Sequence, residues 1–151
     1  MKIKNKLMIN LCLIIFISIC GIIWWNVPSS LTNIEPYDVS KIEIFDGNTG
    51  TAITITKISD IEHIINNLNS VTLKKEAVSL GRMGYSFKTT IYKANGKVYK
   101  KFIINSNDTI RNDPFFYEDS LSSIDYDYIR KLIKEQVKWI YLTLLYLQDM
   151  L

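Results

Sequence analysis

The sequence predicts an α+β fold, in which an N-terminal transmembrane helix precedes a small antiparallel sheet of hairpins with two helices packed on one face. Three observations support this prediction. Residues 7–25 carry no charged side chain, pairs of alternating apolar and polar segments flank turn-forming residues, and two later segments have apolar residues at helical spacing. Hairpins imply antiparallel strands, and amphipathic helices need a sheet face on which to bury their apolar side.

The first predicted element is the apolar helix over residues 7–25. At about 1.5 Å per residue it is roughly 28 Å long, close to the hydrocarbon thickness of a bilayer. Lys2, Lys4 and Lys6 precede it, and basic residues stay on the cytoplasmic side of a membrane. We therefore expect a single-pass protein of the cell membrane that contacts the bilayer through residues 7–25, with a cytoplasmic N-terminus and an extracytoplasmic domain.

Two other interpretations of this segment remain open. A cleaved secretory signal has a shorter apolar core and small residues before the cut, whereas here an aromatic pair is followed by Asn26 and Val27. A lipoprotein signal has a small residue before its lipidated cysteine, whereas Ile19 precedes Cys20. An uncleaved signal-anchor fits the segment best, and the sequence decides neither its cleavage nor the lipidation of Cys20.

Composition divides the chain into three parts. Residues 1–27 are predicted to be the signal-anchor, residues 28–38 a linker with two prolines, and residues 39–151 the extracytoplasmic domain. Three of the 18 basic residues precede the apolar run, and all 15 acidic residues lie at or beyond Glu35, so the exported part is neutral. We therefore expect no nucleic-acid partner.

Two hairpins are predicted from period-two alternation. Residues 39–45 and 51–56 alternate around an Asp-Gly-Asn-Thr-Gly turn. Residues 85–93 and 97–104 flank Asn95-Gly96, a dipeptide that favours a type I′ turn. We also expect a short strand over residues 71–77.

Between these hairpins and the last helix the pattern is weaker. Residues 79–84 contain two glycines and are predicted to form a loop. Residues 109–111 are predicted to form a short edge strand, and residues 113–117 an aromatic loop.

Two helices are predicted in the domain. Ser59 and Glu62 match a capping box, and apolar residues follow at i, i+3, i+4 and i+7. The second helix starts near Ser123 and is amphipathic through Lys138. The residues predicted to form the core are Ile61, Ile64, Ile65, Leu68, Phe87, Ile91 and Phe102.

The last helix ends in residues 139–147, which are apolar on every side. Nine residues are too few to span a bilayer. This run either packs into the domain's own sheet or contacts a membrane surface or a protein partner. We favour membrane or protein contact through residues 139–151, because a small two-layer domain has little room for so wide an apolar surface.

The sequence predicts no catalytic, cofactor-binding or metal-binding residue. His63 is the only histidine and is expected on a helix surface, because a triad or a zinc site needs further ligands. The segment from Asp46 begins like a calcium loop, but Gly50, Thr51 and Lys57 occupy the positions that need an oxygen ligand, glycine and glutamate. A hairpin turn is the better interpretation.

Three further features have simple structural interpretations. Residues 81–84 have the GXXG spacing of a nucleic-acid-clamping loop, but a strand follows where that loop needs a helix. Asp125 and Asp127 lie about 200° apart on a helix and are expected to interact with its dipole. Five aromatic residues are expected to close the core more than to form a recognition surface: Phe115, Phe116, Tyr117, Tyr126 and Tyr128.

The layout from Lys41 to Lys134 resembles the small extracytoplasmic domains that low-GC Gram-positive bacteria carry behind a lipoprotein signal or a single anchor. The resemblance is carried by Ile42–Gly47, the helix after Ser59, and Tyr92–Tyr99. It implies an anchored domain and transfers no catalytic residue. The chain departs from this layout in the residue before Cys20 and in its apolar tail.

Three functions follow as hypotheses. The first is a membrane-tethered, non-enzymatic binding or accessory domain whose partner is unknown, since tethering raises effective concentration near membrane partners. The second is a bacteriocin-immunity or toxin-shielding membrane protein. The third, an envelope hydrolase, needs a nucleophile and a base, and the single histidine argues against it.

Overall fold

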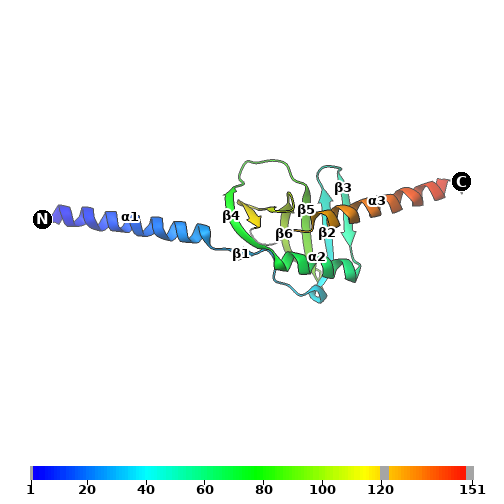
Figure 1. Cartoon of the computed structure of the whole chain (residues 1–151), viewed down its shortest axis with the longest axis horizontal. Coiled ribbons are helices and arrows are strands. Elements are labelled where there is room, and N and C mark those ends of the chain that lie inside the picture. The colour runs from blue at the N-terminus through cyan, green and yellow to red at the C-terminus, as the bar shows by residue number, and fades with distance from the viewer. Residues whose placement is uncertain (1, 120–122, 149–151) are drawn as a thin grey trace.

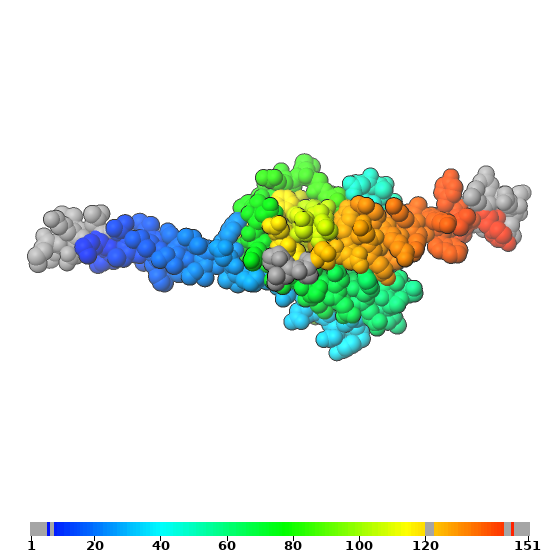
Figure 2. Space-filling model, in the orientation of Figure 1, coloured from blue at the N-terminus to red at the C-terminus, as the bar shows by residue number. Residues whose placement is uncertain are grey.

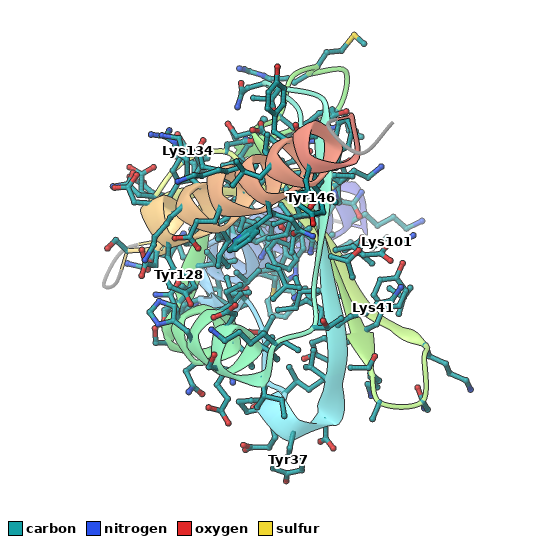
Figure 3. The ribbon with its side chains drawn as sticks, turned by 90° about the vertical axis from the view of Figure 1, so that its right-hand side faces the viewer. Tyr37, Lys41, Lys101, Tyr128, Lys134 and Tyr146 are labelled. Carbon is teal, nitrogen blue, oxygen red and sulfur yellow. The ribbon has the colours of Figure 1, made fainter. Side chains whose placement is uncertain are left out.

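The computed structural model describes residues 2–119 and 123–148. The chain starts with a long helix, α1 (Lys2–Asn26), and continues into an eight-stranded sheet accompanied by α2 (Ile58–Ser70) and α3 (Tyr126–Gln148). Figure 3 shows α2 and α3 on the same side of the curled sheet. The predicted α+β class is confirmed, with an N-terminal apolar helix, an antiparallel sheet and two helices on one face.

The sheet has the order β1-β4-β8-β7-β6-β5-β2-β3, and each neighbouring pair is antiparallel. A one-turn 3₁₀ helix, η1 (Pro36–Asp38), precedes β2. The strands are β1 (Ser29–Ser30), β2 (Val39–Asp46), β3 (Thr51–Ile55), β4 (Thr72–Val78), β5 (Phe87–Lys93), β6 (Val98–Ile104), β7 (Thr109–Asn112) and β8 (Phe115–Asp119).

Both predicted hairpins are present, as β2–β3 and β5–β6. The turn type expected between β5 and β6 is wrong, because Gly96 has a positive φ of 78° and Asn95 does not. The Lys93 amide donates to the Lys97 carbonyl, and the Gly96 amide donates to the Lys93 carbonyl, each at 2.8 Å. These bonds enclose a three-residue loop that ends in a left-handed glycine, the usual alternative to a two-residue turn.

Two expectations for the second half of the sheet are wrong. Strand β7 lies between β6 and β8, so it is an interior strand and not an edge. Residues 115–119 form β8 and pair with β4 as well as β7, where a loop was expected over residues 113–117. The aromatic residues of this segment suit a strand, and pairing on both sides satisfies its backbone.

Helix α2 buries the predicted stripe of Ile61, Ile64, Ile65 and Leu68. The predicted capping box is wrong, since α2 begins at Ile58 and no side chain caps its first amides. All seven residues predicted to form the core are buried. The rest of the core comes from the sheet, from the segment after α1 and from α3, through Leu31, Ile34, Val39, Ile42, Ile44, Ile53, Ile55, Val71, Leu73, Ile104, Ile110, Ile124, Ile129 and Ile133.

The segment expected to be a linker packs on the domain over part of its length. Residues 29–30 pair with β4 as strand β1, and Leu31 is fully buried. The Lys100 ammonium donates to the Leu31 carbonyl, and the Thr32 hydroxyl donates to Asn69 Oδ1 at 2.8 Å. Burial lowers the pKa of Lys100. The structured domain therefore begins about ten residues before the predicted boundary at residue 39.

Helix α1 contains one stretch, Met8–Asn26, that is long and apolar enough to cross a membrane. Its last turn contacts the sheet, because the Trp24 and Trp25 rings lie edge-on to Phe115 at centroid distances of 5.8 and 5.6 Å. The Lys75 ammonium lies over the Trp24 ring and donates to the Trp24 carbonyl at 3.0 Å. Helix α1 extends from one end of the molecule and α3 from the other (Figure 1).

Candidate functional site

The first half of α3 packs firmly on the domain, and it carries the side chains of the candidate site described below. Ile129 and Ile133 are buried in the core. Asp125 caps the helix, since its Oδ1 accepts the Tyr128 amide at 3.1 Å. Asp125 therefore satisfies one of the free amides of the first turn and places a negative charge at the positive end of the helix dipole. This agrees with the structural role expected for this carboxylate.

His63 lies on the surface of α2, as expected, and joins α2 to α3. Its Nε2 is 2.8 Å from Asp125 Oδ2, and its ring stacks on Tyr128 at a centroid distance of 3.9 Å. The Tyr128 hydroxyl donates to Asp60 Oδ1 at 2.9 Å. Burial, and then the bond to Asp60, raises the pKa of Tyr128. Figure 3 shows Tyr128 between the two helices.

This cluster is a bridge between helices, because its polar atoms already bond one another. Asn67 adds to it by accepting the Asp125 amide at 2.9 Å and donating to the Ser123 carbonyl at 3.1 Å. In the described part of the chain, no three His, Cys, Asp or Glu side chains are placed to hold a metal ion.

A groove runs between α3 and the turn that joins β2 to β3. It has a volume of about 930 Å³, within the range of protein ligand pockets. Its wall on α3 combines apolar and basic side chains, and the opposite wall is the polar turn with the start of β3. The lining residues are Asp46, Asn48, Thr49, Thr51, Ser86, Phe87, Tyr126, Arg130, Ile133, Lys134, Val137, Lys138 and Tyr141.

The electrostatics of the groove are dominated by three basic side chains, Arg130, Lys134 and Lys138, spaced four residues apart on α3. Asp46 is the acidic residue of the lining, and its two oxygens accept the Asn48 amide at 2.8 Å and the Thr49 hydroxyl at 2.9 Å. Asp46 is also largely buried. The Asp46 carboxylate is therefore hydrogen-bonded within its own turn. The side chains of the groove that face solvent with a charge are the three basic ones.

Toward its C-terminal end, α3 passes the edge of the groove and leaves the domain, and its described apolar side chains there are exposed. Trp139, Tyr141 and Tyr146 each expose about 70% of their surface, and Ile140 exposes 52%. Figure 2 shows this part of α3 continuing past the body of the domain. The described residues of the apolar run therefore do not pack into the domain's own sheet, which was the other alternative.

The remaining sequence candidates have structural roles. The carboxylate of Asp46 closes its own hairpin turn, which is the interpretation preferred over a calcium loop. The Gly81–Gly84 segment is a connection into β5, and the Arg82 carbonyl accepts from Arg111 Nη1 at 2.8 Å. Of the predicted aromatic group, Tyr117, Tyr126 and Tyr128 pack against the core, while Phe115 contacts the end of α1.

Sequence reasoning missed two features of the surface. The spacing of Arg130, Lys134 and Lys138 was visible as an i, i+4, i+8 series, but nothing local indicated that the β2–β3 turn faces it. The contact of Lys75 with Trp24 joins positions 51 apart in the chain, so no local pattern could indicate it.

Comparison of the chain with protein-family models, with curated proteins and with solved structures found no match to any of the three.

Proposed function

We propose that this chain is a membrane-tethered, extracytoplasmic, non-enzymatic binding domain of a bacterial cell, and that α3 carries its binding surface. The observation on which the proposal rests is the exposed apolar half of α3 beside a positively lined groove. Monomeric soluble proteins rarely expose large continuous apolar patches, and such patches mark sites of contact with proteins or membranes. A tether also allows a weak interface to be occupied, because it concentrates the domain near its partners.

The tether is supported by α1 and its flanks. Three lysines precede the apolar run and two tryptophans end it, which is the pattern of a helix with its N-terminus in the cytoplasm. A fusion at the C-terminus tests this orientation. Alkaline phosphatase, which is active outside the cytoplasm, should be active there, and a fluorescent reporter that matures only in the cytoplasm should be silent. The opposite pattern, or a mature N-terminus beyond Asn26 or at a lipidated Cys20, would overturn the anchor.

The non-enzymatic part of the proposal is supported by the contacts that His63 makes. Its ring stacks on Tyr128 and its Nε2 bonds the carboxylate that caps α3. These contacts give it a structural role and explain why a histidine lies here without invoking a reaction.

The binding surface is tested by site-specific photo-crosslinking in intact membranes. A photoreactive residue at Tyr141 should form a discrete protein adduct, because its side chain is exposed at the groove. The matched control is Lys97, which is exposed in the β5–β6 loop and should form none. Absence of an adduct at Tyr141, or the same adduct at both positions, would refute α3 as the binding surface.

A further inference from the structure

We infer that the groove between α3 and the β2–β3 turn is a docking site for an acidic amphipathic helix of a protein partner. This inference rests on the proposed function and adds the chemistry of the partner. Helix-in-groove recognition uses apolar anchors on one face of a helix, at spacings of three and four residues. The groove supplies a counterpart for such a face and for a flanking row of carboxylates.

The apolar part of the groove lies along α3. Tyr126, Val137 and Tyr141 line it from one side of the helix, with the ring of Phe87 below Tyr126 at a centroid distance of 4.6 Å. Val137 and Tyr141 are exposed, so a partner can cover them. Large apolar side chains in a pocket of this kind are the usual anchors of a protein interface.

Charge identifies the partner as acidic. Lys134 and Lys138 form no ion pair within the described residues. Arg130 lies over the Tyr126 ring at 4.9 Å from its centroid, and it reaches Asp127 only at 3.7 Å, where the Asp127 side chain is 91% exposed. On an α-helix, residues four apart are about 6 Å from each other along the axis. Carboxylates at i, i+4 and i+8 of a docked helix therefore match the spacing of these three basic groups.

The same charges argue against a second copy of this chain as the occupant. From Arg130 to Lys138, α3 carries Arg130, Lys131, Lys134 and Lys138 against a single acid, Glu135, a net charge of +3. Pairing two such segments would place like charges side by side, which disfavours association.

The direction of α3 argues against a lipid surface. Helix α1 and the exposed half of α3 extend from opposite ends of the molecule (Figure 1). The contacts of Trp24 and Trp25 with Phe115, and of Lys75 with Trp24, hold the end of α1 against the sheet. A bilayer that contains α1 therefore lies at the other end of the molecule from the groove.

The test uses the full chain in nanodiscs of neutral phosphatidylcholine and three labelled helical peptides of 18 residues. The first peptide carries leucine along one face of its helix and, next to that face, a row of glutamates at positions i, i+4 and i+8. The second has lysine in place of glutamate, and the third is a scrambled form of the first. Fluorescence anisotropy measures binding of each peptide. In a separate experiment without peptide, the same nanodiscs are mixed with phosphatidylglycerol vesicles, and co-sedimentation measures binding to the anionic lipid surface.

We expect the glutamate peptide to bind, and the lysine and scrambled peptides to bind at least tenfold more weakly. The double variant K134E/K138E should lose at least tenfold in affinity for the glutamate peptide and gain affinity for the lysine peptide. The matched control K88E/K97E changes two exposed lysines outside the groove and should bind as the wild type does. Affinity should also fall as salt rises, because exposed charges are screened.

No binding of the glutamate peptide, or equal binding to wild type and K134E/K138E, would overturn the inference. Sedimentation of the nanodiscs with anionic vesicles, without peptide binding, would identify a lipid surface as the ligand and also overturn it. Membrane anchoring is measured separately by resistance to carbonate extraction. A chain that stays anchored and fails to bind the peptide refutes the acidic helix alone, whereas an extracted chain refutes the tether.

Discussion

At the scale of single residues, Asp125 uses its two carboxylate oxygens for two different elements. Oδ1 caps α3 through the Tyr128 amide, and Oδ2 bonds His63 on α2. The residue thus sets both the start of α3 and its position against α2. The binding surface that we assign to α3 depends on this position, although Asp125 lies outside the groove.

We predict that Asp125→Ala lowers the free energy of unfolding by about 1–2 kcal/mol, the usual cost of losing an N-cap. Asp125→Asn should lower the free energy of unfolding much less, because asparagine also caps helices. His63→Ala should lower it by about 1 kcal/mol, since it removes one hydrogen bond and one ring stack of a half-exposed group. Urea denaturation of residues 28–148 measures all three. An equal loss for Asp125→Asn and Asp125→Ala would contradict the capping role.

A second residue-scale feature is the ion pair on the outer face of the sheet. Glu43 accepts from the Lys41 ammonium and from the Tyr92 hydroxyl, the latter at 2.7 Å. The bond from Lys41, followed by that from Tyr92, lowers the pKa of Glu43 below its ordinary value near 4.5. Because the folded state binds this proton more weakly than the unfolded state, Glu43 adds stability above pH 4.5.

We predict that this stability is lost as the pH falls from about 4.5 through the lower pKa of the folded protein. The effect is small, since both side chains of the pair are 38% exposed and solvent screens their charges. Glu43→Gln should flatten the pH dependence of the unfolding midpoint between pH 5 and pH 3, by about a few tenths of a kcal/mol in free energy. If the unfolding midpoint of the wild type and of the variant changed equally with pH, this assignment would be contradicted.

At the scale of elements, the parts that sequence predicts well are those with a local period. The α2 stripe and the two hairpins follow from spacings within about twenty residues. The parts missed depend on distant partners. Leu31 is buried under Lys100, and Thr32 bonds Asn69, so a polar, proline-flanked segment joins the sheet. The basic row on α3 was readable, whereas the turn that faces it is some 85 residues away in the chain.

The exposed half of α3 gives the element-scale prediction. Residues 28–138 and residues 28–148, expressed without α1, should unfold with free energies within about 0.5 kcal/mol of each other, as expected for surface changes. The exposure of Trp139, Ile140 and Tyr141 is the reason. The longer form should also self-associate or aggregate more readily, because its apolar run meets water. Analytical ultracentrifugation and urea denaturation test both points, and a clearly more stable, monomeric longer form would show that the tail packs on the domain.

At the scale of the whole molecule, the contact between α1 and the sheet determines how the domain is oriented relative to α1. Phe115 of β8 receives both tryptophan rings, and Lys75 of β4 binds the end of α1. Each contact is modest, since an aromatic pair contributes about 0.5–1.5 kcal/mol beyond the area it buries. Together they place strands β4 and β8 next to the end of α1, while the C-terminal part of α3 extends from the other end of the molecule.

We predict that Phe115→Ala together with Lys75→Ala loosens this orientation and leaves the fold intact. Spin labels on Lys97 and on the lipid headgroups of a nanodisc should report a distance distribution that broadens in the double variant. Tyr37→Ala, which changes an 80% exposed residue outside the contact, serves as the control and should not broaden it. Unchanged distributions in the double variant would mean that the tryptophans do not fix the domain.

In the proposed membrane orientation, the opposite directions of α1 and α3 would make the molecule a spacer of set height. Tyr141 is the last residue of α3 that lines the groove, and residues 142–148 continue past it to the end of the helix. These seven residues add about 10 Å of reach beyond the groove at the helical rise. In the proposed orientation, a partner lying flat on the same membrane is out of reach, and a partner that stands as tall as the domain, or belongs to the next layer of the envelope, is within it. Lengthening or shortening the protein between its two ends would therefore change which neighbours it meets, even with every contact residue kept.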